Sequence, residues 1–186
     1  LLDFMNVMEE SSKKDLSQWK KRWLETSMVN QLEPYFRCKK GRISHFELIQ
    51  TGSQEHPTLR THRTQLGLYR RSGGGLKLNR SLAVTYSGAS TPVPQLLGKL
   101  CPHFVYPNRG DFDYVQVKLD QKSLKAVESH LVTIEDSFLR HILWSDLWQM
   151  VLKAELSLDR YLSLVEFNGL SLSLIHISEP TRPFHI

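Results

Sequence analysis

Histidines are the first residues of this 186-residue chain that could do metal chemistry. A helical zinc centre of the H-E-x-x-H type places two imidazoles one turn apart and uses the glutamate as a general base. No two histidines here are four residues apart, and His45-Phe46-Glu47 has the wrong spacing on a strand-like pattern. We therefore predict that the chain binds no metal. The histidines considered are His45, His56, His62, His103, His130, His141, His176 and His185.

A glycine-rich stretch, from Ser72 to Gly75, follows two arginines and is the candidate for a phosphate loop. Phosphate loops need a helix N-terminus after the glycines and, in the Walker form, a Gly-Lys-Ser/Thr ending. Here a strand-like run follows and that ending is missing. We predict that these residues form a hairpin turn.

The two cysteines, Cys38 and Cys101, have neither a neighbouring histidine nor a C-x-x-C partner, so no nucleophile is predicted. Two isolated thiols do not suggest a disulfide framework. They favour a reducing compartment, and we predict a cytoplasmic location.

Two further groups have a possible binding role. Asn108, Asp111 and Asp113 form a small acidic segment with too few regularly spaced oxygen ligands for a calcium loop, so a turn is expected. Trp144 and Trp148 could stack on a base or a sugar, but their apolar surroundings favour a place in the core. We therefore predict no catalytic, cofactor-binding or metal-binding residue in this chain.

The elements that would position these residues begin with a helical segment over about residues 1–26. Leu16, Trp19 and Trp23 recur at helical spacing and share a face. Asp15, with Gln18 three residues later, fits a capping box at the start of the second helix.

Short strands and turns are expected from residue 28 to residue 120. Strand-like runs cover residues 31–38, 43–51, 61–71, 76–87 and 112–119, with turn signals between them. Pro92 and Pro94 each lack an N–H, so the segment around them must be an edge strand or an extended linker. This pattern predicts a mostly antiparallel β-sandwich.

After residue 120 the hydrophobic period becomes helical. Leu124, Val127 and Leu131 lie on one face, and residues 133–136 suit the start of a second helix. The second helix is apolar over much of its circumference, which predicts packing neighbours on several sides. Its apolar residues are Phe138, Leu139, Ile142, Leu143, Trp144, Leu147, Trp148, Met150 and Val151, and a third helix contains Leu158, Tyr161, Leu162 and Val165.

The net charge of +5 is concentrated in the β-rich part. Such a face could bind nucleic acid or an anionic surface. We favour a solvated face, or one that meets an acidic domain, because no RNP-like motif or helix-turn-helix accompanies the charge. No apolar run is long enough to span a bilayer, and the first residues lack signal-peptide features. We therefore predict no nucleic-acid partner and no membrane partner, and the chain is expected to be the interior of something longer.

Several segments, taken in order, resemble the aminopeptidase N family of zinc metallopeptidases, in its bacterial-type subgroup of gluzincins. The likeness covers about residues 1–166 and is carried by scattered matches. The matching segments are residues 15–26, 29–32, 56–60, 62–63, 66–69, 94–96, 107–108, 113–120, 134–140, 143–150, 156–157 and 161–165.

The resemblance implies an α+β fragment: a short helical start, an antiparallel β-sandwich, then α-helices of a truncated, solenoid-like helical domain. It implies C-terminal helices of the catalytic domain in residues 1–27, the sandwich in 28–120 and the start of the helical domain in 121–169. The parent would use zinc to remove N-terminal amino acids from peptides. The family's catalytic residues would all lie upstream, so none is carried onto this chain.

On this reading the chain by itself is inactive, and its partners are the missing catalytic domain and the remaining C-terminal helices. Two alternatives stay open: a stand-alone sandwich and helical module that binds a protein partner, and a basic nucleic-acid-binding domain. The final residues, 170–186, depart from the helical pattern, and Leu172 to Arg182 resemble the translation of a sequencing-library adapter. We predict that this tail is an artefact.

Overall fold

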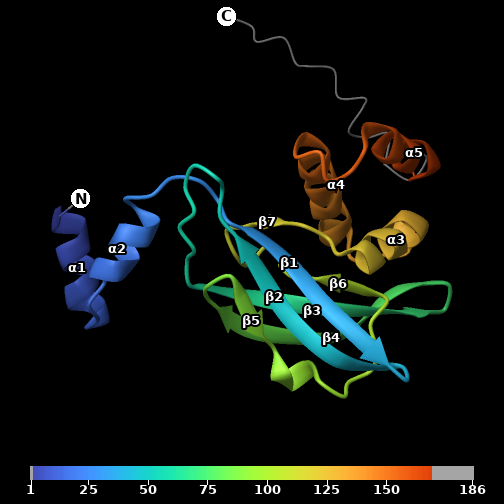
Figure 1. Cartoon of the computed structure of the whole chain (residues 1–186), viewed down its shortest axis with the longest axis horizontal. Helices are drawn as coiled ribbons and strands as arrows, with labels where there is room; N and C mark the ends of the chain where they lie inside the picture. Colours follow the sequence, from blue (N-terminus) through green and yellow to red (C-terminus); the bar gives the residue numbers. More distant parts are fainter. Residues whose placement is uncertain (1, 169–186) are drawn as a thin grey trace, which may run out of the picture.

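The structure is a computed structural model that describes residues 2–168. Two helices, α1 (Leu2–Ser12) and α2 (Ser17–Trp23), come first, and a two-sheet β region and a group of helices follow (Figure 1). This order confirms the predicted α+β fold class. None of the helices in the described range is both long and apolar enough to cross a bilayer. The predicted adapter tail lies outside the described residues.

The start of α2 differs from the capping box predicted at Asp15. Leu16 occupies the N-cap position, and Asp15 Oδ1 instead accepts a hydrogen bond from the N–H of Ser17 at 2.8 Å. The carboxylate therefore closes a short local turn with the N–H two residues on. A capping box would instead use the N–H three residues on. Glu9 Oε1 accepts a bond from Leu16 N at 2.8 Å, which ties α1 to the connection.

Two sheets form the β region. The first has the order β5 (Ser90–Pro92), β2 (Arg42–Thr51), β1 (Gln31–Lys39), β7 (Gln116–Val117), and the second β4 (Gly75–Tyr86), β3 (His62–Ser72), β6 (Phe104–Tyr106). The β1–β2 and β3–β4 hairpins confirm the strand predictions, with Gly73 and Gly74 in the second turn. The proline-containing β5 is an edge strand, and a short 3-10 helix, η1 (Pro94–Leu96), follows it.

Two strands depart from the sequence prediction. The expected strand over residues 112–119 is reduced to β7, which pairs with β1 in parallel. The strand β6 was missed because all three of its residues are buried, so it shows no polar–apolar alternation. Its side chains serve two cores: Val105 lies in the core between the sheets, while Phe104 and Tyr106 belong to the core shared with the helices.

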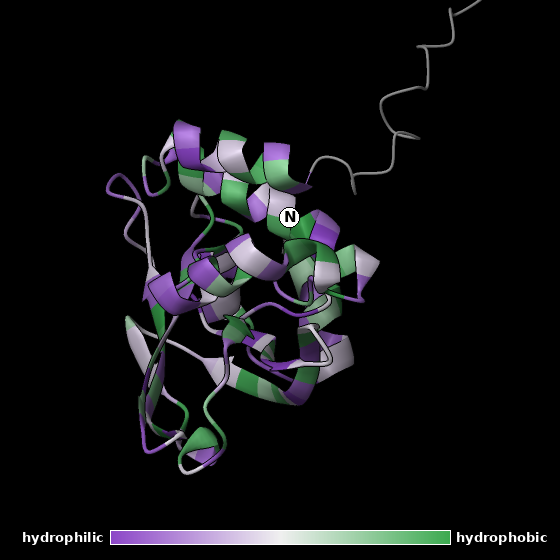
Figure 2. Cartoon of the chain, turned by 90° about the vertical axis from the view of Figure 1, so that its right-hand side faces the viewer, coloured by the Kyte–Doolittle hydropathy of each residue, from purple (hydrophilic) through white to green (hydrophobic). Residues whose placement is uncertain are grey.

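The two cores place the second sheet in the middle of the molecule. One core lies between the sheets and includes Leu32 and Phe46 from the first sheet and Leu66 from the second. The other packs the second sheet against the C-terminal helices and includes Phe104 and Leu143. Hydrophobic residues accordingly occur along both strands and helices (Figure 2).

The C-terminal helices are α3 (Gln121–His130), α4 (Ser137–Leu152) and α5 (Leu158–Asn168), with a 3-10 turn, η2 (Leu131–Thr133), after α3. Asp120 caps α3 by accepting bonds from Lys122 N and Ser123 N at 3.0 Å, and Asp136 caps α4 through Leu139 N at 3.1 Å. The predicted face of α3 and η2 is confirmed, because Leu124, Val127 and Leu131 are fully buried.

The expectation of two isolated thiols is wrong. Cys38 and Cys101, 63 residues apart in sequence, form a disulfide. Sequence spacing could not show this pairing, because the segment before β6 returns to the β1–β2 turn only through the tertiary fold. There Cys101 N donates to Gly41 O at 2.9 Å. The argument from free thiols to a reducing compartment therefore loses its basis.

Candidate functional site: a buried polar joint

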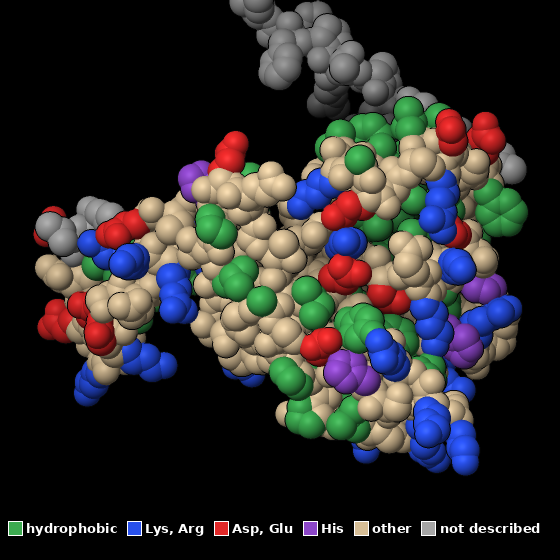
Figure 3. Space-filling view, viewed as in Figure 1, with side chains coloured by type: hydrophobic (Ala, Val, Ile, Leu, Met, Phe, Trp, Pro, Cys, Tyr) green, Lys and Arg blue, Asp and Glu red, His purple; other side chains and the backbone are tan. Residues whose placement is uncertain are grey.

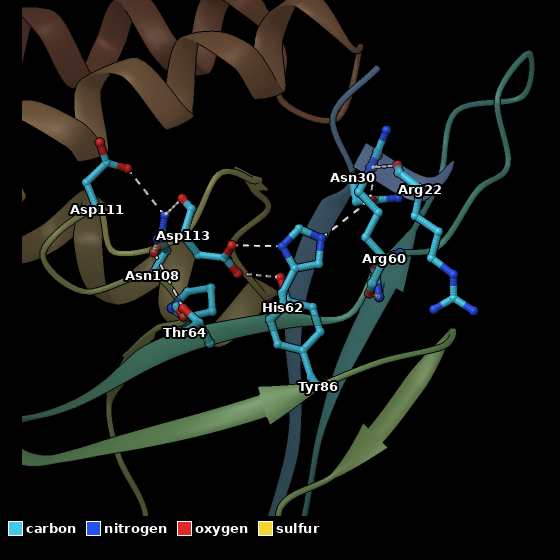
Figure 4. A network of polar contacts seen from close by, with 11 residues as sticks. Arg22, Asn30, Arg60, His62, Thr64, Tyr86, Asn108, Asp111 and Asp113 are labelled. Carbon is cyan, nitrogen blue, oxygen red and sulfur yellow. Dashed lines mark hydrogen bonds and ion pairs between the residues drawn. The ribbon is translucent and has the colours of Figure 1, made fainter. Parts of the chain in front are cut away.

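A chain of buried polar side chains connects the N-terminal helices, the sandwich and the loop before β7 (Figure 4). Its centre is Arg60, two residues before β3, and His62, the first residue of β3. Both are buried, with 5% and 4% of their surface exposed. Buried charged and polar groups are stable only when they are hydrogen-bonded, so the partners of these two residues define the site.

Arg60 is held by main-chain carbonyls and neutral side chains. Its guanidinium donates to Arg22 O at 2.8 Å, to Thr26 Oγ1 at 2.9 Å and to Asn30 Oδ1 at 2.9 Å. It also lies 5.4 Å from the centre of the Trp23 ring. No carboxylate pairs with it among residues 2–168, so carbonyl dipoles at the end of α2 and the indole face balance the charge.

The backbone at Arg60 is fixed from the other side. Gln50, buried on β2, accepts from Arg60 N at 2.9 Å through Oε1 and donates to Arg60 O at 3.0 Å through Nε2. Asn30, just before β1, donates from Nδ2 to Thr58 O at 2.8 Å. The loop between β2 and β3 is thus bonded to β2 and to the residue just before β1, and these bonds set the direction in which the Arg60 side chain points.

His62 lies between two aromatic rings and a carboxylate. Its ring stacks on Tyr86, with 5.1 Å between centroids, and meets the Trp23 ring edge-on at 4.9 Å. Its Nδ1 is 2.7 Å from Asp113 Oδ1. Tyr86 donates its hydroxyl proton to Asp113 Oδ2 at 2.8 Å. Burial, with the Asp113 charge adding to it, raises the pKa of Tyr86, so the phenol stays protonated and remains a donor.

Asn108 sets the position of Asp113. Its Oδ1 accepts from Asp113 N and its Nδ2 donates to Asp113 O, both at 2.9 Å. The same Nδ2 lies 3.3 Å from Asp111 Oδ1. Thr64 Oγ1 donates to Pro107 O at 2.7 Å and joins this loop to β3. The acidic segment is therefore a turn closed by an asparagine, as the sequence predicted.

A His–Asp pair is part of many catalytic centres, but here the geometry is that of a structural contact. The side chains of His62 and Asp113 are only 1% and 7% exposed. The free ring nitrogen, Nε2, has Asn30 Oδ1 at 3.5 Å, and among the described residues no hydroxyl or thiol nucleophile bonds to it. A general base must reach the proton it removes. Aromatic rings cover this imidazole, so the joint positions chain segments.

A second polar contact joins the sandwich to the helices. Tyr106, on β6, donates its hydroxyl proton to Asp146 Oδ2 on α4 at 2.6 Å. Burial raises the pKa of Asp146 to about 7, and the charge of Asp111 adds to the shift. This contact lies at a groove of about 520 Å³ between α4 and the loop before β7, which Tyr114 and His141 also line.

The other residues singled out in the sequence stay apart. His56 is exposed in the loop after β2, while His62 is buried, so the two do not form a joint site. His45 pairs with Glu47 on β2 at 3.2 Å. The rings of Trp144 and Trp148 contact Tyr161 on α5 with centroid distances of 5.9 and 5.4 Å.

Sequence reasoning considered His62 and Asp113 separately and missed that they bond to each other. Their separation of 51 residues gives no local signal. Residues 2–168 contain no group of three or more His, Cys, Asp or Glu side chains that is arranged to hold a metal ion.

Comparison of the sequence with known proteins finds a relative. The chain is 38% identical over 174 residues to an aminopeptidase N of Streptomyces lividans, a match that covers 89% of this chain. No family model matches the chain. Fold and similarity together define an α+β chain that is similar to one part of a curated aminopeptidase. More particularly, the chain belongs to the aminopeptidase N family, and it spans about a fifth of the length of that curated relative.

Proposed function

We propose that this chain is a non-catalytic part of a zinc-dependent aminopeptidase that removes N-terminal amino acids from peptides. The observation that carries the proposal is the 38% identity to an aminopeptidase N over 89% of the chain. In the parent, zinc would activate water and a glutamate would act as base, in a domain outside this sequence. Peptides would be the substrates of that domain.

The proposed role of this part is to connect and position. We propose that residues 1–27 end the catalytic domain, that 28–120 form the sandwich, and that 121–169 begin the helical domain. The buried joint supports this role. Arg60, on the sandwich, bonds directly to carbonyls of residues 22, 26 and 27. A rigid polar contact of this kind would fix the angle between the catalytic domain and the sandwich.

The apolar surface of the last helices supports a larger parent. Large hydrophobic side chains are exposed on α4 and α5, as they are on helices that contact another part of a protein. We propose that further helices of the parent cover it. The exposed side chains are Phe138, Trp148, Leu152, Leu158, Leu162 and Phe167.

The test uses two proteins: this chain, and a longer chain with the sequence that lies upstream in the source DNA. Each is dialysed against zinc, its zinc content is measured, and hydrolysis of an aminoacyl-arylamide is followed. We expect zinc and turnover only in the longer chain. An upstream reading frame without H-E-x-x-H, or stoichiometric zinc and turnover with the short chain, would contradict the proposal.

A cytoplasmic location stays a prediction and has its own test. Thiols in producing cells are blocked with an alkylating reagent before lysis, and the modification of Cys38 and Cys101 is read by mass spectrometry. In a reducing compartment both are alkylated, whereas an intact disulfide in the harvested protein places the chain in an oxidising one.

A further inference from the structure

The disulfide lies at a solvent-facing tip of the sandwich. Cys38 is exposed near the end of β1, directly after an irregularity in the β1–β2 register, and Cys101 is partly buried in the segment before β6. Cys38 is therefore the more exposed residue of the pair and the one that a small molecule in solution meets first.

An ammonium group lies at the sulfur of Cys101, the less exposed residue of the pair. Lys122 Nζ, on α3, is 2.9 Å from Cys101 Sγ and 5.2 Å from the centre of the Phe36 ring. The charge of Asp120 is the acidic influence on the Lys122 ammonium group. A cation at this distance stabilises a thiolate on Cys101, and thiols with a lowered pKa are better leaving groups in disulfide exchange.

The surroundings of the disulfide are basic. Lys and Arg side chains gather at the end of the molecule where β1 turns into β2 (Figure 3). The pKa of His103 is lowered, first by burial and then by the charges of Lys122, Arg70 and Arg71, so these cations converge on one region. The basic neighbours in the sequence are Arg37, Lys39, Lys40, Arg42 and Lys99. A positive field of this kind raises the local concentration of anions.

From these observations we propose that the Cys38–Cys101 disulfide is an exchange site for small anionic thiols, with Cys38 as the sulfur that is attacked. The incoming thiolate forms a bond to Cys38 Sγ while the Cys38–Cys101 bond breaks, and the electron pair leaves on Cys101 as a thiolate beside Lys122. The small thiol is oxidised to a mixed disulfide and Cys101 is reduced. A second thiolate then releases Cys38, and the two small thiols leave as their own disulfide.

The fold allows this exchange without unfolding the sandwich. Main-chain bonds hold the same two segments together independently of the sulfurs: Ile43 N donates to Lys99 O at 2.8 Å, Gly98 N to Ile43 O at 2.9 Å and Cys101 N to Gly41 O at 2.9 Å. Opening the disulfide therefore loosens the tip and leaves both sheets paired. This site is independent of the aminopeptidase role proposed above.

The test follows the exchange by mass spectrometry. The oxidised chain is mixed under native conditions with glutathione, which has a net negative charge, or with cysteamine, which carries an ammonium group, at equal thiolate concentration. We expect glutathione to react faster, to lose this advantage in high salt, and to be found on Cys38 in the peptide map. An adduct on Cys101, equal rates for both thiols, or reaction only in denaturant would overturn the proposal.

Two variants isolate the contribution of the lysine. Lys122→Gln should slow exchange by roughly threefold or more, since the Cys101 thiolate loses its counter-charge. Lys125 is an exposed lysine on the same helix, and Lys125→Gln changes the net charge equally. This variant should react at the same rate as the unsubstituted chain. Circular dichroism establishes that both variants are folded. Equal rates for the two folded variants would show that Lys122 has no part in the exchange.

Discussion

The carboxylate of Asp113 lies 2.7 Å from the Nδ1 of His62, and the same carboxylate accepts the hydroxyl proton of Tyr86. One side chain in the loop before β7 thus bonds to the first residue of β3 and the last residue of β4. These strands pair directly, His62 opposite Tyr86. The contact therefore closes the open end of the hairpin on which Arg60 depends for its position.

Removing the Tyr86 hydroxyl tests how much its hydrogen bond to Asp113 contributes to stability. We expect Tyr86→Phe to lower the free energy of unfolding by about 1–3 kcal/mol, because Asp113 Oδ2 loses its donor in a buried place. Urea denaturation measures the change. Tyr35→Phe is the matched control, since Tyr35 is 37% exposed and its hydroxyl bonds only to exposed Arg37 in the described structure. Equal losses in the two variants would contradict the structural importance of the joint.

Arg60 should be the most sensitive residue of the joint. Arg60→Gln leaves carbonyl groups at the end of α2 and in the segment after it without their donor, and we expect a loss of about 3 kcal/mol or more in unfolding free energy. Amide exchange should also speed up in residues 17–27, which the guanidinium attaches to the sandwich. Arg63→Gln, at an exposed position near the start of β3, should change little. If the amides of residues 17–27 exchange as slowly in Arg60→Gln as in the unsubstituted chain, the attachment depends on other contacts.

Asp146 gives stability a defined pH dependence. Its folded pKa of about 7 lies above the ordinary value near 3.8, so the folded state favours the protonated acid. The stabilisation is complete below about pH 4 and is lost as the pH rises through about 7. Asp146→Asn can still accept the bond from Tyr106 without a charge. We expect the unfolding free energy of this variant to vary less between pH 4 and 7, and the variant to be more stable than the unsubstituted chain at pH 8.

The measurement for Asp146 is the unfolding free energy in urea across this pH range. Glu166→Gln, which removes an exposed carboxylate on α5, is the control and should leave the slope unchanged. If the unfolding free energy changed by the same amount between pH 4 and 7 in the unsubstituted chain and in both variants, Asp146 would not titrate as described.

Gly75 is required by a close approach between the sandwich and the helices. A Cβ at this position would lie 2.9 Å from the main-chain oxygen of Thr133 in η2, and a main-chain atom cannot move aside cheaply. Gly75→Ala should therefore lower the melting temperature by several degrees, consistent with about 1–3 kcal/mol of strain. Ser72→Ala, an exposed change at the other end of the same turn, should have little effect. A melting temperature for Gly75→Ala equal to that of the control would mean that η2 adjusts freely.

The sequence by itself determined the elements whose signals are local. Alternation and turn residues located the two hairpins, and helical spacing located Leu124, Val127 and Leu131 on one buried face. The aminopeptidase N likeness was also present in the sequence, because it depends on residue identities in order. These features need only neighbours along the chain, so a linear pattern records them.

Only the tertiary structure decided the contacts between distant residues. The Cys38–Cys101 bond spans 63 residues and the His62–Asp113 contact spans 51. The strand β6 is three fully buried residues and gave no alternating pattern, and the parallel pairing of β7 with β1 needed the whole sandwich to bring them together. Each of these depends on where chain segments return in space, a property of the packed cores that no local pattern of residues encodes.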